Sequence, residues 1–155
     1  MLAAQLQHLG AVNIGAAGTL LIRRPISRAL LRAEIASRLP FDAEIMICPG
    51  RDIARLMSQD FFAGHRARRD LVRFVSVLSR RPRSAPELPI WLPSRHQWLL
   101  KVLAGDDRYL VGVYRRQMRV IGCLGRLDGV FGVPVTTRSW NTMIAVASLL
   151  DAGGT

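Results

Sequence analysis

Arginine is the side chain in this sequence whose type and spacing best suit a chemical role, because its planar guanidinium stays charged and pairs with phosphate or carboxylate oxygens. Seven arginines against one acid, Asp70, give residues 65–83 a net charge of +6, which is more than half of the +11 on the 155-residue chain. Such a segment predicts an anion-facing surface. The candidate anion-binding residues are Arg66, Arg68, Arg69, Arg73, Arg80, Arg81 and Arg83.

These arginines flank one expected strand, Leu71–Leu78, which is rich in valine and phenylalanine. Because eight residues in a strand span roughly 25 Å, the groups before and after it lie at opposite ends. This spacing favours an extended polyanion such as nucleic acid over a small phosphate ligand. Phe74 is the only aromatic residue of the segment, so binding would depend mainly on backbone phosphates and would weaken with salt. Arg115–Arg119 would extend the same surface.

A compositional origin of the charge is the alternative interpretation. The 22 basic residues include a single lysine, Lys101, and such a preference for arginine is typical of G+C-rich codon usage. The arginines would then form a solvated surface without a dedicated ligand, because net charge by itself produces only non-specific attraction. The two interpretations differ in whether the arginine side chains converge in the folded protein.

The residues for metal and acid–base chemistry are few. His8, His65 and His96 are far apart, and none has a second histidine or a cysteine at ligand spacing, so no metal site is predicted. Cys48 and Cys123 lie in apolar surroundings, which favours reduced, buried thiols over a catalytic dyad. The sequence therefore predicts no catalytic residue, no metal and no cofactor, and whether the protein is an enzyme stays open.

The most distinctive stretch is Gly132–Met143, which reads Gly-Val-Pro-Val-Thr-Thr-Arg-Ser-Trp-Asn-Thr-Met. Ser139 suits the N-cap of a final helix that the following tryptophan would anchor. One interpretation is a docking motif that holds this helix on a sheet. The other is a small-molecule or enzymatic site, in which Arg138 pairs with an anionic group while Asn141 and Thr142 supply polar contacts at the helix N-terminus.

Apolar spacing in the first half of the chain predicts alternating strands and helices. Strands are expected at residues 19–23, 44–48 and 71–78, with helices at 25–39 and 53–61 between them. The glycine-rich approach to the first strand lacks the lysine of a phosphate-binding loop, so its glycines are assigned to turns. This order predicts an α+β fold with helices packed on mixed or antiparallel sheets.

The second half of the chain predicts a β-hairpin followed by helices. Residues 98–103 and 109–114 are rich in strand-forming side chains, and the turn between them contains Asp106 and Asp107. Residues 118–131 keep a helical spacing despite three glycines that lower helix propensity. A final helix follows the distinctive motif.

Three prolines between Arg81 and Pro89 exclude regular structure there and predict a linker. The expected organisation is an N-terminal α/β subdomain at 1–80, a linker at 81–89 and a C-terminal α/β subdomain with the final helix at 90–155. A third functional interpretation is a homodimer, in which an exposed apolar strand at 71–78 pairs with its copy.

Composition excludes a disordered tail. Half of the residues are hydrophobic and the mean hydropathy is +0.19, so the chain can bury a core. No window approaches about eighteen consecutive apolar residues, so no spanning helix is expected. Residues 1–10 lack the basic start and the cleavage site of a signal peptide. We therefore expect a cytoplasmic protein that does not associate with membranes.

The run Val133–Thr142 resembles the C-terminal signature of the domain-of-unknown-function 1697 family. The order of upstream elements is also similar, from a glycine-bearing strand to a helix that ends at Asp60-Phe61-Phe62. The resemblance implies a bacterial α+β protein with two α/β subdomains of ferredoxin-like character and no established activity. The positions that match the family motif are Thr136, Thr137, Arg138, Trp140, Asn141 and Thr142.

Two departures separate this chain from the family pattern. The chain begins inside the family's first helix, without the usual opening strand and glycine-rich loop, which would make it a short or divergent member. Ala17-Gly18-Thr19 stands where the next family strand usually has Ser-Gly-Asn. If those segments form a ligand site in the family, this chain lacks much of it.

Overall fold

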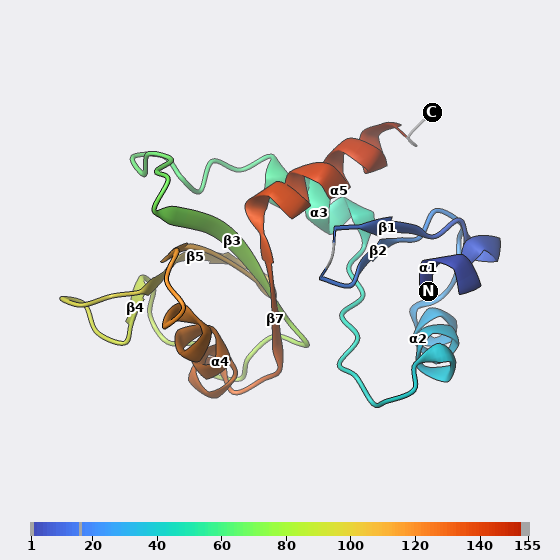
Figure 1. The fold of residues 1–155 in the computed structure, drawn as a ribbon, viewed down its shortest axis with the longest axis horizontal. Coiled ribbons are helices and arrows are strands. Elements are labelled where there is room, and N and C mark those ends of the chain that lie inside the picture. The colour runs from blue at the N-terminus through green and yellow to red at the C-terminus, as the bar shows by residue number, and fades with distance from the viewer. Residues whose placement is uncertain (1, 16, 153–155) are drawn as a thin grey trace.

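Seven strands and the helices around them form an α+β fold in the computed structural model, which describes residues 2–15 and 17–152 (Figure 1). The strands make two antiparallel sheets, one of two strands and one of five. The helices are α1 (Leu2–Gln5), α2 (Arg28–Arg38), α3 (Gly50–Met57), α4 (Val120–Phe131) and α5 (Trp140–Ala152), with a short 3-10 helix, η1 (Gln7–Leu9). The strands are β1 (Val12–Ile14), β2 (Thr19–Leu21), β3 (Leu71–Leu78), β4 (Ile90–Leu92), β5 (Leu100–Asp106), β6 (Tyr109–Arg115) and β7 (Val135–Ser139).

The larger sheet has the strand order β4-β5-β6-β3-β7, and every neighbouring pair is antiparallel. The strand predicted at Leu71–Leu78 is confirmed as β3, in which Phe74 pairs with Gly112 of β6 on one side and with Ser139 of β7 on the other. Because both edges of β3 are paired within the sheet, the prediction that this strand is exposed for pairing with a copy is wrong.

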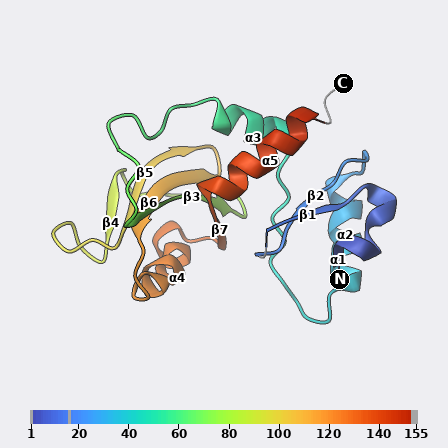
Figure 2. The same ribbon diagram turned by 45° about the horizontal axis from the view of Figure 1, so that its top comes forward.

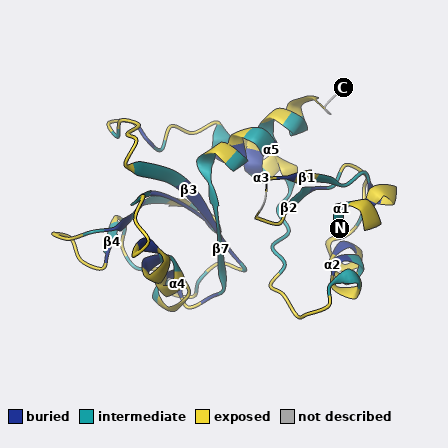
Figure 3. Ribbon diagram, in the orientation of Figure 1, coloured by how far each residue is buried: buried dark blue, intermediate teal, exposed yellow. Residues whose placement is uncertain are grey.

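Helices cover both faces of this sheet (Figures 1 and 2). Successive residues of β3 point to opposite faces. Phe74 packs in one core with Leu127 of α4, and Val75 packs in the other with Ile53 of α3 and Met143 of α5. Buried positions accordingly follow the strands and the inner sides of the helices (Figure 3). No helix among the described residues combines the length and the apolar character needed to cross a bilayer.

The smaller sheet is a hairpin of β1 and β2. The strand predicted at residues 19–23 is confirmed as β2, although it ends at Leu21, whereas β1 and the hairpin were not predicted. Its turn region contains Gly15 and Gly18 with positive φ angles of 69° and 78°, where glycine carries no steric cost. Ile14 and Leu21 bury against the core that α5 also joins. Helix α2 follows, and it begins later than the predicted start at residue 25 because the hydroxyl of Ser27 caps it.

Residues 44–48 were predicted as a strand, and that prediction is wrong. They belong to an extended connection from α2 to α3 that is part of neither sheet (Figure 1). Side chains satisfy its carbonyl groups in place of a neighbouring strand. Arg32 donates to the carbonyl oxygen of Ile45 at 2.6 Å, and Arg108 donates to that of Ile47. The carbonyl groups of Ile45 and Ile47 therefore have partners although the run joins neither sheet.

The hairpin predicted in the second half is confirmed as β5–β6, and its turn fastens α3. Asp107 adopts the left-handed conformation there, with a φ of 58°. Asp106 accepts hydrogen bonds from Arg55 of α3 at 3.1 Å and from Gln59 at 2.7 Å. The hydrogen bond from Arg55 is the main cause that lowers the pKa of Asp106. These two aspartates therefore serve the turn and the docking of a helix.

Residues 81–89 connect β3 to β4, two strands of the same five-stranded sheet. They contain no helix or strand, as the three prolines predicted. β3 comes from the first half of the chain, yet it lies between β6 and β7 of the second half. The larger sheet is thus assembled from both sides of this connection. The glycine-bearing stretch at 118–131 forms α4 from residue 120 onwards.

Candidate functional site

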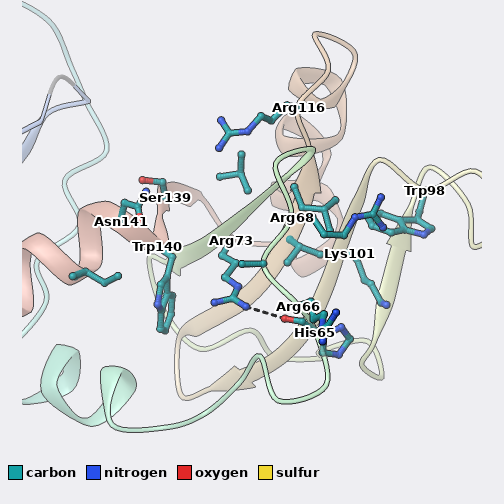
Figure 4. Close-up of a pocket in the computed structure, with 15 residues that line it drawn as sticks. His65, Arg66, Arg68, Arg73, Trp98, Lys101, Arg116, Ser139, Trp140 and Asn141 are labelled. Carbon is teal, nitrogen blue, oxygen red and sulfur yellow. Dashed lines mark hydrogen bonds between the residues drawn. The ribbon is translucent and has the colours of Figure 1, made fainter.

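A cleft lies on the five-stranded sheet beside the start of α5. The rest of this helix packs over Val75 and Val77, further along β3. The volume of the cleft is about 470 Å³, and Figure 4 shows the side chains around it. We call it the cationic cleft. It is lined by His65, Arg66, Ala67, Arg68, Leu71, Val72, Arg73, Trp98, Lys101, Val113, Arg116, Ser139, Trp140, Asn141 and Ile144.

The floor of the cationic cleft follows from strand register. Arg73 of β3 pairs with Val113 of β6, and Val113 pairs with Lys101 of β5. Side chains at directly opposed positions of an antiparallel pair share one face, so these three form a row across the sheet. The loop that contains His65–Arg68 and the first turn of α5 rise on the sides of this row.

Five cationic side chains and no carboxylate line the cleft among the described residues. The side chains of Arg66 and Lys101 form neither a hydrogen bond nor an ion pair with another described residue, which leaves their charges available to a ligand. Arg68 pairs with Asp70 at 2.9 Å, but the two side chains are 61% and 47% exposed, so the pair is weak and exchangeable. Like charges gathered around one cleft create a positive potential that attracts anions.

Two of the five cations also fix the loop that carries Arg66 and Arg68. Arg73 donates to the carbonyl oxygen of His65 at 2.8 Å, and its guanidinium lies 4.5 Å from the centre of the Phe62 ring. Arg116 donates to the carbonyl oxygen of Arg69 at 2.8 Å. The loop is therefore held against the sheet at both ends of its basic stretch.

Two tryptophans stand at opposite sides of the cleft, with Arg73 and Lys101 between them (Figure 4). Trp140 is half-buried and meets the Phe62 ring nearly at a right angle, with 4.9 Å between centroids. Trp98 is half-buried, and two cations lie near its ring. The Arg115 guanidinium lies 4.0 Å from its ring centre and the Lys101 ammonium 5.6 Å. The site thus combines positive charge with two large flat surfaces.

Some residues of the C-terminal motif hold α5 on the sheet, and others line the cleft. Ser139 caps α5, because its hydroxyl accepts a hydrogen bond from the backbone N–H of Thr142 at 3.3 Å. Thr137 makes a 2.6 Å hydroxyl contact with the buried Ser76 of β3. Trp140 and the exposed Asn141 line the cleft, whereas Thr136, Thr137 and Thr142 do not. Docking of the last helix and lining of the cleft are therefore both functions of this motif.

Arg138 does not take the position that the small-molecule interpretation requires. Its side chain turns toward the β1–β2 hairpin, where it donates to the Thr19 hydroxyl at 2.8 Å and to the carbonyl oxygen of Ala17 at 2.6 Å. Burial lowers the pKa of Arg138. The hypothesis that Arg138 pairs with a bound anion beside Trp140 is therefore wrong in this arrangement, since the guanidinium is used to join the two sheets.

Replacing Arg138 by leucine is expected to lower the free energy of unfolding by about 1–3 kcal/mol, because the hydrogen bonds to a charged group are lost. Urea denaturation followed by circular dichroism measures this loss, and faster amide exchange at Thr19–Leu21 would locate it. Anion binding in the cationic cleft should stay unchanged. A variant with wild-type stability and lost anion binding would restore Arg138 to the site.

The seven predicted arginines do not converge. Arg66, Arg68 and Arg73 line the cleft, whereas Arg80, Arg81 and Arg83 follow the far end of β3, as the length of the strand predicted. Arg81 forms an ion pair with Asp107 of the β5–β6 turn. The side chain of Arg69 does not line the cleft, and its contribution is the carbonyl oxygen that Arg116 binds.

Two cleft residues were missed as site residues by sequence reasoning. Lys101 is the only lysine of the chain, and Trp98 was assigned only to an expected strand. The predicted hairpin at residues 98–114 could have pointed to both residues. Once its second strand, β6, is placed beside β3, Lys101 lies on the same face of the sheet as Arg73. Arg116 was expected only as part of a surface that continues the arginine segment.

Comparison of the chain with protein-family models, with curated proteins and with solved structures finds no match. Among residues 2–15 and 17–152, no group of three histidine, cysteine, aspartate or glutamate side chains is placed to hold a metal ion. The site is therefore interpreted from its own geometry and charge.

Proposed function

We propose that this protein is a non-enzymatic binding protein whose cationic cleft takes the phosphate backbone of a nucleic acid. The observation that carries the proposal is the grouping of Arg66, Arg68, Arg73, Lys101 and Arg116 around one cleft without a carboxylate in its lining. Phosphate contacts by arginine and lysine dominate the affinity of nucleic-acid-binding proteins because they release condensed counterions. Although four of the seven predicted arginines lie outside the cleft, the grouping of these five cations supports a dedicated site over a compositional surface.

A salt titration of the wild-type protein tests the proposal. Four or five phosphate contacts on a single strand predict that affinity for a fluorescein-labelled 15-nucleotide oligomer falls about 50- to 130-fold between 50 and 200 mM salt. Fluorescence anisotropy measures the dissociation constant at each concentration. Absence of binding at 50 mM salt, or an affinity that does not change with salt, would contradict the proposal.

A small anionic ligand is the second candidate, favoured by the volume of the site. A volume of about 470 Å³ lies in the range of small-molecule pockets, and the exposed Asn141 at the start of α5 offers both a donor and an acceptor. Competition distinguishes the candidates. A mononucleotide or inorganic phosphate that displaces the oligomer at micromolar concentration favours the small ligand, whereas displacement only at millimolar concentration favours the polymer.

We further propose membership of the domain-of-unknown-function 1697 family, with its ferredoxin-like character, a bacterial source and a cytoplasmic location. The support for the family is the motif at residues 133–142, which supplies the cap of α5 and one side of the cleft. Ser139→Ala would separate the capping of α5 from the lining of the cleft by the next two residues, because it removes the capping hydroxyl and keeps Trp140 and Asn141.

A further inference from the structure

We propose that the nucleic acid bound in the cationic cleft is single-stranded and that its bases stack on Trp98 and Trp140. This inference rests on the proposed function, because it specifies which form of the polyanion the cleft accepts. It adds a role for the two aromatic side chains, which a site for phosphate alone does not need.

The strand register places the aromatic and cationic groups along one line. Trp140 follows the last residue of β7 and packs next to Arg73 through the Phe62 ring. From Arg73 the row runs over Val113 to Lys101, which pairs in turn with Trp91 of the edge strand β4. The row therefore crosses three neighbouring strands about 4.8 Å apart, and the Lys101 ammonium at its end lies 5.6 Å from the ring centre of Trp98.

The path continues beyond Trp98. A second hollow of about 420 Å³ shares Trp98 with the cationic cleft and is lined by Arg115 and Arg119 as well as by Gln97 and Gln117. Trp98 therefore stands between two basic depressions. A ligand that extends through both depressions passes over the indole ring, whereas a compact ligand fills one of them.

The arrangement selects against a duplex. Its bases are paired and stacked on each other, so only its phosphates can approach the protein. In the cleft the cations Arg73 and Lys101 lie between the two tryptophans (Figure 4). An unpaired strand can present its bases to the indole rings and its phosphates to the arginines together. Stacking on aromatic side chains is independent of base identity, so little sequence preference is expected.

An abasic probe tests this inference on the wild-type protein. We compare a 15-nucleotide thymidine oligomer, an abasic oligomer with the same number of phosphates, and a 15-base-pair duplex by anisotropy at one salt concentration. The thymidine oligomer should bind at least about tenfold more tightly than either of the others. Equal affinity for the thymidine and abasic oligomers overturns the stacking inference and leaves phosphate binding in place. Failure of all three to bind overturns the proposed function itself.

Variants at Trp98 test whether this side chain itself contributes the stacking. Trp98→Leu should weaken binding of the thymidine oligomer about tenfold and leave the abasic oligomer unaffected, and Trp98→Phe should restore most of the loss. Phe41→Leu is the matched control, because this aromatic side chain is 63% exposed in the connection before α3. Equal weakening of both oligomers by Trp98→Leu would overturn the inference. If this variant fails to fold, the abasic comparison on the wild-type protein still decides.

Discussion

Replacing Gly112 by alanine is expected to lower the free energy of unfolding by about 3 kcal/mol or more, although it adds a single methyl group. Gly112 lies in the middle of β6, opposite Phe74 of β3. A Cβ atom there would stand 2.1 Å from the carbonyl oxygen of Lys101 and 2.7 Å from the Phe74 ring. Neither contact can be relieved by a flexible side chain, because one is backbone and the other is a fully buried ring.

Helix α4 offers the matched control for this substitution. A Cβ atom at Gly125 would meet nothing within 4 Å, and alanine is favoured over glycine inside a helix. Gly125→Ala is therefore expected to raise the free energy of unfolding by up to about 1 kcal/mol. Urea denaturation of both variants by circular dichroism measures the difference. A Gly112→Ala protein within about 1 kcal/mol of the wild type would show that β5 and β6 can separate without cost.

Removing three charges from the cationic cleft is expected to weaken oligonucleotide binding by about 100-fold or more at 50 mM salt, because each lost phosphate contact no longer releases a counterion. The variant replaces Arg66, Arg68 and Lys101 by serine. All three side chains line the cleft, and none supports the core, so the fold should be retained. Anisotropy gives the affinity, and the slope of its salt dependence should fall by about two.

The far end of β3 provides a control with the same change in net charge. Arg80, Arg81 and Arg83 follow the strand and lie outside the cleft. Replacing these three by serine is expected to change the affinity by less than about threefold, because the loss acts only through the long-range field. Equal weakening by the two triple variants would mean that the protein attracts polyanions by its overall charge, and the cleft would then have no special role.

Local patterns predicted the strands and helices whose own residues decide their structure. Leu71–Leu78 is rich in valine and phenylalanine, as expected for a strand that packs into a core on each face, and it forms β3 at those bounds. The run at 44–48 has similar apolar character, but two arginine side chains bind its carbonyl groups and it pairs with no strand. Its composition was compatible with both outcomes, and only the tertiary environment distinguished them.

The candidate site was predictable in parts and not as a whole. The arginine segment and the C-terminal motif were both identified, but as competing hypotheses, because nothing local shows that residues 65–73 and 139–141 face each other. Their meeting depends on the pairing of β3 with β7 and on the packing of Trp140 against Phe62. The direction of Arg138 was equally inaccessible, since its partners lie in a hairpin that the sequence did not predict.

The pairing of Phe74 with Ser139 has a consequence for biosynthesis. β3 is translated long before β7, so an unfinished chain presents this strand of the sheet with one edge unpaired. Formation of this contact closes a long stretch of chain, which makes it a slow step of folding. The cleft cannot be complete until residues 135–144 have left the ribosome. Any ligand of the cationic cleft therefore has to wait until β7 has paired with β3.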